Sequence, residues 1–320
     1  MAVGRRSGEC GLGCSRRCAA GPFLSVCAVT VVGMGGEDRF VSVADGVRLH
    51  VRSWPGSLRP FILVHGLSSN ALLWDEVADY LSDARHPVHA IDLRSHGTSD
   101  APESGYDTAT AAEDVFQVAQ QLGLDPAVAA GQSWGGNVVV ELAARHPTAV
   151  AALALVDGGW FSPASDFPDR SAWATAARPP AIDGRRADDI RAFFTRNHPD
   201  WSPAAINATM ANLAVAADGT VARRLSIDHH MQIALDMWDS PPQRSYAHVQ
   251  VPVMLVPALP SDATAASGRR ERIAAAAAQL PRATIREYPG GDHDLHAQHP
   301  RDLAIDLLNL AASVDVEAHR

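Results

Sequence analysis

The sequence predicts an α/β protein in which a mostly parallel, eight-stranded sheet is covered by helices on both faces. Short apolar runs alternate with longer amphipathic segments from Glu37 onward. Most of these runs are continuously apolar, which is typical of parallel strands buried on both faces. Residues 160–248 break the alternation, so we expect a core formed by residues 37–159 and 249–320 with an insertion between its two parts.

The first two predicted strands form a hairpin. Phe40–Val43 and Val47–Ser53 flank Ala44-Asp45-Gly46, and an Asp-Gly pair favours a tight turn. Pro147 ends one of the predicted helices, because proline cannot continue a helix. The other predicted strands are Phe61–Val64, Val88–Asp92, Ala127–Ala130, Ala151–Val156, Val253–Val256 and Thr284–Tyr288. The predicted helices are Ala71–Ser82, Thr108–Leu122, Trp134–His146, Arg269–Leu280 and Arg301–Ala312.

The insertion, residues 160–248, is predicted to be mostly helical and is rich in aromatic residues. It holds four of the seven tryptophans and four of the eight phenylalanines. It also contains two Pro-Pro pairs, which are typical of loops and turns. One hypothesis is a small subdomain with its own packed core. The other is a helical lid that lines an apolar pocket, with Trp160 and Phe161 as candidate substrate-binding residues.

The composition excludes several classes of chemistry. All 27 basic residues are arginine, so Schiff-base and pyridoxal-phosphate chemistry and a GxxxxGK phosphate loop are excluded. The formal net charge of −9 favours neither nucleic acid nor an anionic membrane as a partner, and no apolar stretch is long enough for a membrane span. All four cysteines lie within the first 27 residues, which excludes a cysteine nucleophile or a thiolate zinc site in residues 28–320. We expect no cofactor, and the sequence indicates no oligomeric state.

Residues 1–36 differ from the rest of the chain. One hypothesis is a dispensable, non-native extension with translation starting at Met34, since over-reading of a GC-rich gene produces such Gly-, Arg-, Ala- and Cys-rich sequence; a cytoplasmic protein is then expected. A second is an export signal, because arginines precede an apolar run from Ala19 to Met34. A third gives Cys10, Cys14 and Cys18 a metal or redox role.

The strongest chemical signal is Gly131-Gln132-Ser133-Trp134-Gly135-Gly136, which follows a predicted strand and opens a predicted helix. This is the G-x-S-x-G nucleophile elbow in its strand–turn–helix context, which makes Ser133 the candidate nucleophile. His65-Gly66-Leu67 ends an earlier strand, where glycine allows the backbone to approach a substrate. The backbone N–H groups of Leu67 and Trp134 are therefore the candidate oxyanion hole.

These residues resemble those of the α/β-hydrolase family. The resemblance covers residues 39–315 and is carried by Val64-His65-Gly66, by Asp92–Asp100 (DLRSHGTSD), by the elbow and by Gly291-Asp292-His293. It implies a nucleophile–acid–histidine triad in that chain order and a lid inserted at residues 160–248, and it makes His293 the base. Ser95 departs from the family's usual DxRGHGxS, which has glycine at this position.

The three histidines His293, His296 and His299 also have a spacing that could place metal ligands along one helical face. We expect no metal there. His293 follows Gly290-Gly291 after a strand and is positioned to turn inward as the base. For His296 and His299 we expect helix capping or satisfied polar contacts.

The acid of the triad is left open between two aspartates. The family's usual position follows the strand Val253–Val256, where this chain has Asp262, displaced by one position from the family pattern. Some relatives carry the acid directly after the strand that follows the elbow helix, and Asp157 stands there. Asp157 is the first choice and Asp262 the alternative.

The sequence therefore predicts a serine hydrolase that cleaves a small apolar or aromatic carboxylic ester through an acyl-enzyme intermediate. One alternative is that the same site cleaves C–C bonds or forms peracids. Another is a ligand-binding protein on this fold without turnover.

Overall fold

The computed structural model describes residues 35–124 and 126–318, and its centre is an eight-stranded sheet in the order β1-β2-β4-β3-β5-β6-β9-β11. β1 pairs antiparallel with β2 and β2 with β4, whereas all other neighbours are parallel. The predicted mostly parallel, eight-stranded sheet is confirmed. Its strands are β1 (Glu37–Ser42), β2 (Arg48–Trp54), β3 (Phe61–Val64), β4 (Val88–Ile91), β5 (Ala127–Gln132), β6 (Val150–Val156), β9 (Val253–Val256) and β11 (Ala283–Ile285).

The turn of the hairpin is a short 3-10 segment, η1 (Ala44–Gly46). Asp45 and Gly46 adopt φ angles of 59° and 74°, a left-handed conformation that aspartate tolerates and glycine adopts freely. The Asp-Gly pair therefore turns the chain where the sequence predicted it. β1 and β2 then pair in register from Glu37 opposite Ser53 to Ser42 opposite Arg48.

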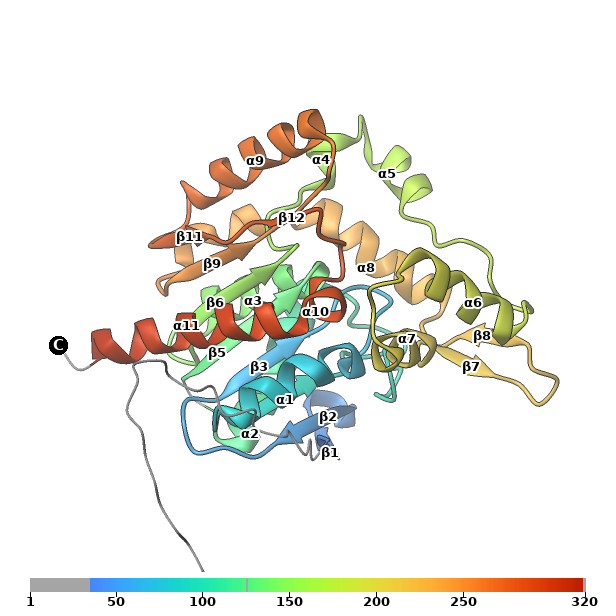
Figure 1. Ribbon diagram of the computed structural model, residues 1–320, viewed down its shortest axis with the longest axis horizontal. Coiled ribbons are helices and arrows are strands. Elements are labelled where there is room, and N and C mark those ends of the chain that lie inside the picture. The colour runs from blue at the N-terminus through green and yellow to red at the C-terminus, as the bar shows by residue number, and fades with distance from the viewer. Residues whose placement is uncertain (1–34, 125, 319–320) are drawn as a thin grey trace, which may run out of the picture. The chain divides into compact units, whose positions relative to one another are not determined.

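Helices cover both faces of the sheet (Figure 1). On one face, buried residues of α1 and α11 pack with Phe61 and Leu63 of β3; on the other, α2, α3 and α9 pack with Ile62 and Val64. Neighbouring residues of β3 thus face opposite cores, as expected for a strand buried on both sides. The helices are η2 (Ala71–Trp74), α1 (Asp75–Asp83), α2 (Thr108–Leu122), α3 (Trp134–Arg145), α9 (Ala263–Ala277), α10 (Leu295–Gln298) and α11 (Pro300–Ala318).

Several predicted elements differ from the observed ones in their bounds: the predicted helix Ala71–Ser82 is divided into η2 and α1, and the predicted helix Arg301–Ala312 extends to Ala318. α9 begins at Ala263 rather than Arg269, because Asp262 caps it by accepting a hydrogen bond from the N–H of Ala265. The run Thr284–Tyr288 is split between β11 and β12 (Tyr288–Pro289), and β12 pairs with β10 (Ala258–Leu259) in a separate two-stranded parallel sheet.

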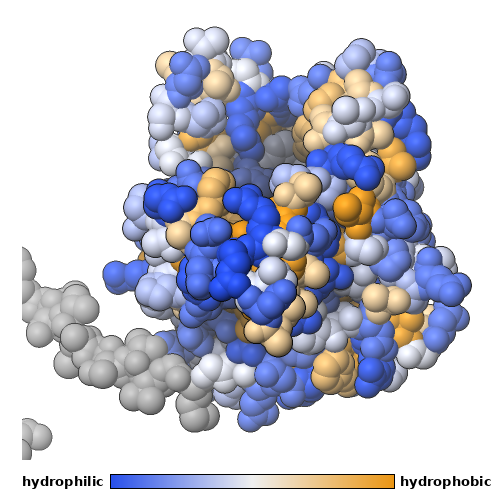
Figure 2. Space-filling model, turned by 90° about the vertical axis from the view of Figure 1, so that its right-hand side faces the viewer, coloured by the Kyte–Doolittle hydropathy of each residue, from blue (hydrophilic) through white to orange (hydrophobic). Residues whose placement is uncertain are grey.

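Residues 160–248 lie beyond the carboxyl ends of the parallel strands (Figure 1). They are mostly helical, and they also contain an antiparallel pair, β7 and β8, that the composition did not indicate. Viewed from the side of this segment, the surface is hollowed between two raised lobes (Figure 2). Its elements are α4 (Pro163–Asp166), α5 (Arg170–Ala176), α6 (Ala187–Asn197), α7 (Pro203–Met210), β7 (Leu213–Val215), β8 (Val221–Arg223), α8 (Ile227–Asp239), η3 (Pro242–Arg244) and η4 (Tyr246–His248).

The hypotheses for residues 1–36 concern a segment that, up to residue 34, lies outside the described part of the chain. No helix among residues 35–124 and 126–318 has the length and apolar character needed to cross a membrane.

Candidate active site

Ser133 occupies the sharp turn between β5 and α3. Its φ and ψ are 53° and −122°, a conformation that costs a non-glycine residue free energy and is held by its surroundings. Glycine is required on both sides of it: a Cβ at Gly131 would lie 2.1 Å from the carbonyl oxygen of Gly135, and a Cβ at Gly135 would lie 2.4 Å from that of Val64. The strand–turn–helix elbow predicted from the sequence is thus present, with Ser133 at its apex.

The chain after β6 packs directly behind this turn. The N–H of Ser133 donates to the carbonyl oxygen of Val156 at 2.9 Å. A Cβ at Gly158 would lie 2.0 Å from the carbonyl oxygen of Ser133, so only glycine fits there. Asp157, one residue earlier, has a φ of 43°. This close approach brings the end of β6 to the elbow.

Asp157 lies next to His293. The Nδ1 atom of His293 and the Oδ2 atom of Asp157 are 2.6 Å apart. The side chain of Asp157 is 1% exposed, whereas that of His293 is 53% exposed. The other carboxylate oxygen of Asp157 accepts hydrogen bonds from the N–H of Ala258 at 3.0 Å and from Nη2 of Arg269 at 2.5 Å. The carboxylate is thereby fixed on both oxygens.

Asp262, the alternative acid, lies elsewhere. It is exposed at the N-cap of α9, and its Oδ1 accepts the N–H of Ala265 at 2.8 Å. The described residues give it no contact with His293. The two aspartates between which the sequence left the acid open thus have different roles in the fold, and only Asp157 is brought to the histidine.

Burial, a hydrogen bond and nearby charges together set the protonation of His293. Partial burial lowers the pKa of its imidazole, but the hydrogen bond with Asp157 and the negative charges of Asp294 and Asp157 raise it more, so that the pKa lies above its ordinary value. The positive charge of Arg269 acts in the opposite direction. A carboxylate on Nδ1 favours the tautomer whose Nε2 can accept a proton.

Two backbone N–H groups at the site are available as donors. Trp134 is the first residue of α3, where a helix offers its own N–H groups no carbonyl partner. No hydrogen bond of the Leu67 N–H occurs within the described residues. Leu67 and Ser133 line the same two cavities.

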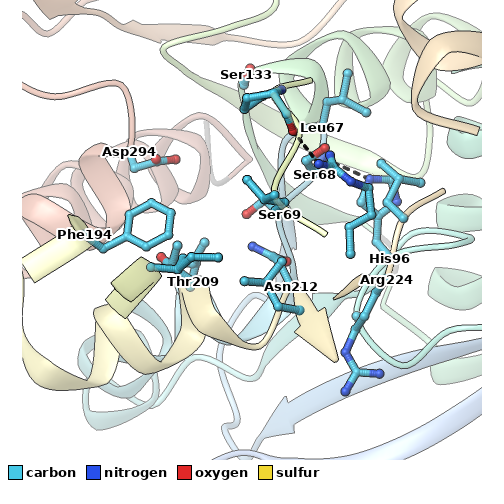
Figure 3. Close-up of a pocket in the computed structure, with 18 of the residues that line it drawn as sticks. Leu67, Ser68, Ser69, His96, Ser133, Phe194, Thr209, Asn212, Arg224 and Asp294 are labelled. Carbon is cyan, nitrogen blue, oxygen red and sulfur yellow. Dashed lines mark hydrogen bonds between the residues drawn. The ribbon is translucent and has the colours of Figure 1, made fainter. Parts of the chain in front are cut away.

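Two buried histidines hold the loop that carries Leu67. His65 bonds the carbonyl oxygen of Gly66 through Nδ1 and accepts the N–H of Leu93 through Nε2 at 3.0 Å. His96 accepts the N–H of Ser68 through Nε2 at 3.2 Å (Figure 3). Burial lowers the pKa of His65 and lowers that of His96 to about 3, so both rings are neutral and can accept these bonds. Sequence reasoning treated His65 and His96 only as motif residues and missed this role.

The loop Asp92–Asp100 packs next to the loop that carries Leu67. The carboxylate of Asp92 accepts hydrogen bonds from the N–H groups of Ala71 and Thr98, and a Cβ at Gly97 would lie 1.9 Å from its Oδ2. Ser95 has a φ of 65°, which explains why the family pattern has glycine there. Its hydroxyl pairs with Nδ1 of His229 in α8, a contact that glycine could not make.

Two cavities meet at Leu67, Ser133 and His293. The larger, of about 870 Å³, runs between α4, α5, α8 and α9, and the candidate residues Trp160 and Phe161 line it. The smaller, of about 480 Å³, runs toward α6, α7 and β8. Both volumes are within the range of small-molecule sites. Arg269 also lines the larger cavity, and nothing in the sequence distinguished it from other surface arginines.

The expectation of satisfied polar contacts for His296 was wrong. The ring is fully buried against Trp74, with 4.6 Å between ring centroids, and neither ring nitrogen has a hydrogen-bond partner among the described residues. Burial lowers its pKa to about 3, so the ring is a neutral core residue. Within residues 35–124 and 126–318, no group of three or more His, Cys, Asp or Glu side chains could hold a metal ion.

Comparison with known proteins supports the fold described above. The family model of the alpha/beta hydrolase fold matches residues 59–196. N-formylmaleamate deformylase of Pseudomonas putida is 32% identical over 152 residues, which are 47% of this chain and 56% of that protein. 2-(Acetamidomethylene)succinate hydrolase of Mesorhizobium japonicum is 34% identical over 124 residues, 38% of this chain and 44% of that protein. The chain thus spans about half the length of these curated relatives.

A solved structure extends the similarity to most of the chain. The crystal structure of E-2-(acetamidomethylene)succinate hydrolase superposes with a TM-score of 0.71, covering 86% of this chain and 98% of that one. At 23% identity, this likeness establishes the fold alone. The matched family model, the strand order and this superposition show that the chain has the α/β-hydrolase fold.

Proposed function

We propose that this protein is a serine hydrolase that cleaves a small carboxylic ester, or a related acyl bond, through an acyl-enzyme intermediate. The observation that carries the proposal is the 2.6 Å contact between His293 Nδ1 and Asp157 Oδ2 beside the elbow of Ser133. A histidine that is oriented by a buried carboxylate and lies next to the serine at the elbow has the parts of an activated nucleophile. The names of the two relatives, a deformylase and a hydrolase, also favour hydrolysis.

In the proposed reaction, Ser133 Oγ attacks the substrate carbonyl while His293 Nε2 takes its proton. The N–H groups of Leu67 and Trp134 donate to the oxyanion, and such donors stabilise the charge that develops in the transition state. His293 then gives its proton to the leaving group and activates a water that hydrolyses the acyl-enzyme. Asp157 holds the imidazole in its tautomer and stabilises the imidazolium.

The larger cavity supports an apolar or aromatic group on the substrate. Trp160, Phe161 and Trp173 line it and pack against the core of the sheet. Phe161 and Trp173 are in tilted contact at 5.8 Å between ring centroids. Aromatic walls of this kind bind apolar groups by burying their surface.

The experiment is covalent labelling with a serine-directed phosphonate, together with turnover of short p-nitrophenyl esters. We expect a mass adduct on the peptide that contains Ser133 and loss of both adduct and turnover in Ser133→Ala. Ser171→Ala, a matched change at an exposed position of α5, should keep both. Turnover that persists in Ser133→Ala, or an adduct on another residue, would overturn the proposal.

A further inference from the structure

The smaller cavity contains a polar cluster that the proposed chemistry at Ser133 does not use. Ser69, Thr209 and Asn212 all line this cavity (Figure 3). Ser69 is 8% exposed, and its Oγ has no hydrogen-bond partner within the described residues. The Oγ1 of Thr209 is also buried and lacks a partner there. Buried hydroxyls are normally paired, so two unpaired ones on residues that line one cavity indicate a binding site.

The third member, Asn212, is oriented by a neighbouring asparagine. Nδ2 of Asn70 donates to Oδ1 of Asn212 at 2.7 Å and to the carbonyl oxygen of Ala208 at 2.8 Å, while Oδ1 of Asn70 accepts the N–H of Leu72 at 2.9 Å. Because its Oδ1 is engaged, Asn212 offers its Nδ2 donor to a ligand. The cluster can therefore present three donors, two hydroxyls and one amide, to a single acceptor group.

Much of the remaining cavity lining is apolar. Its apolar walls come from α6, from the segment that precedes it and from the β7–β8 region. Polar groups placed in such surroundings fix the orientation of a ligand, because an unpaired acceptor elsewhere in the cavity would lose its hydration without compensation. The apolar lining residues in these elements include Ile182, Ile190, Phe193, Phe194, Leu213 and Leu225.

The charges around the cavity favour an anionic acceptor. Three arginines line it: Arg185, Arg223 and Arg224. Among the described residues, Asp294 is the one acidic residue in the lining. Arg223 is partly neutralised by Asp183, at 3.3 Å. In the view of Figure 3, Phe194 lies between Asp294 and Thr209.

We propose that Ser69, Thr209 and Asn212 bind a carboxylate of the substrate, whose acyl carbon then lies at Ser133. The inference rests on the proposed serine hydrolase function and narrows its substrate class to monoesters of short dicarboxylic acids. The apolar chain between the two carboxyl carbons lies against Phe194, and the leaving group extends into the larger cavity. Hydrogen bonds from neutral donors to a carboxylate are among the stronger ones in proteins.

The kinetic test compares monoethyl succinate with ethyl butyrate, which differ only by a terminal carboxylate in place of a methyl group. We expect the wild-type protein to prefer monoethyl succinate in kcat/KM by about 100-fold, the effect of two hydrogen bonds of about 1.5 kcal/mol each to a charged group. Ser69→Ala and Thr209→Val should each reduce this preference by about tenfold, chiefly by raising KM for monoethyl succinate. Thr195→Val, an exposed position of α6, is the matched control.

A binding measurement separates the subsite from the catalysis. Calorimetric titration of the full-length Ser133→Ala variant with succinate should show binding that is lost in Ser133→Ala/Ser69→Ala/Thr209→Val, with a thermal melt confirming that each variant is folded. Succinate binding without turnover of any ester would refute the proposed hydrolase and keep the subsite. Turnover of both esters at equal kcat/KM, no binding of succinate, or a preference for diethyl over monoethyl succinate would overturn the carboxylate subsite.

Discussion

Asp157 and His293 meet at 2.6 Å between Oδ2 and Nδ1, although 136 residues separate them in the sequence. The carboxylate cannot turn away, because its Oδ1 is held by the N–H of Ala258 and by Arg269. The imidazole is consequently oriented with Nε2 free to act at Ser133, which lines the same two cavities as His293.

Asp157→Asn should lower kcat for ester hydrolysis by about 10⁴, because an amide at this position favours the wrong tautomer of His293. Asp262→Asn is the matched comparison and should leave kcat close to the wild-type value, since asparagine caps a helix about as well as aspartate. Steady-state kinetics of the two variants on one ester checks this. A large loss of kcat in Asp262→Asn, with none in Asp157→Asn, would assign the acid to Asp262 instead.

Arg269→Gln should move the acidic limb of the kcat/KM profile to higher pH. His293 acts as a base only when it is neutral, and its raised pKa already places this limb above the ordinary value for histidine. Arg269 lowers that pKa, so removing its charge raises the pKa further. Arg269→Lys should move the limb less, because it keeps the charge.

Arg272→Gln is the control for this shift. Arg272 lines the same cavity as Arg269, but it pairs with Asp166 at 3.0 Å rather than with Asp157. Its profile should coincide with that of the wild type. An Arg269→Gln profile that also coincides with the wild type would show that the charge of Arg269 does not affect the pKa of His293.

Gly158→Ala should destabilise the protein by about 1–3 kcal/mol and reduce ester turnover, because the new Cβ would lie 2.0 Å from the carbonyl oxygen of Ser133 and must displace the elbow. Gly268→Ala provides the contrast. Gly268 is exposed on α9 with nothing within 4 Å of its Cβ position, so alanine there should raise the free energy of unfolding by about 0.5–1 kcal/mol. Urea denaturation measures both, and a neutral Gly158→Ala variant would contradict the close packing.

The free energy of unfolding should fall as the pH drops below about 6.5. Burial lowers the pKa of His89 to about 4 and of His96 and His296 to about 3, so between these values and the ordinary value of 6.5 the unfolded chain binds protons that the folded chain does not. Each histidine contributes a slope of up to about 1.4 kcal/mol per pH unit.

His296→Phe tests this pH dependence most directly, because the buried ring of His296 makes no hydrogen bond within the described residues that phenylalanine would lose. Between pH 6 and 4, the free energy of unfolding of the variant should depend less steeply on pH, because the unfolded variant binds about one proton fewer than the unfolded wild type. His248→Phe, at an exposed position, is the control. Denaturation at a series of pH values gives both slopes, and identical slopes for His296→Phe and the wild type would contradict the prediction.

Much of the framework could be predicted from the sequence because its signals are local. Phe61–Val64 and Val253–Val256 are strands and Thr108–Leu122 is a helix, as predicted from their apolar runs and periodicity. The elbow at Ser133 could also be predicted, since the glycines that permit it, Gly131 and Gly135, are each two residues from Ser133. Boundaries were less accurate where a side-chain cap decides them, as with Asp262 at the start of α9.

The sequence by itself determined the order of strands and helices, the fold class and the candidates Ser133 and His293, because each depends on a short segment. Only the tertiary structure decided that Asp157 rather than Asp262 contacts His293, and that Arg269, 112 residues from Asp157, holds the carboxylate. It also decided that Ser69 and Thr209 line one cavity. These relationships join side chains from separate elements, and their distances follow from how the sheet, the helices and the inserted segment pack, which no local pattern encodes.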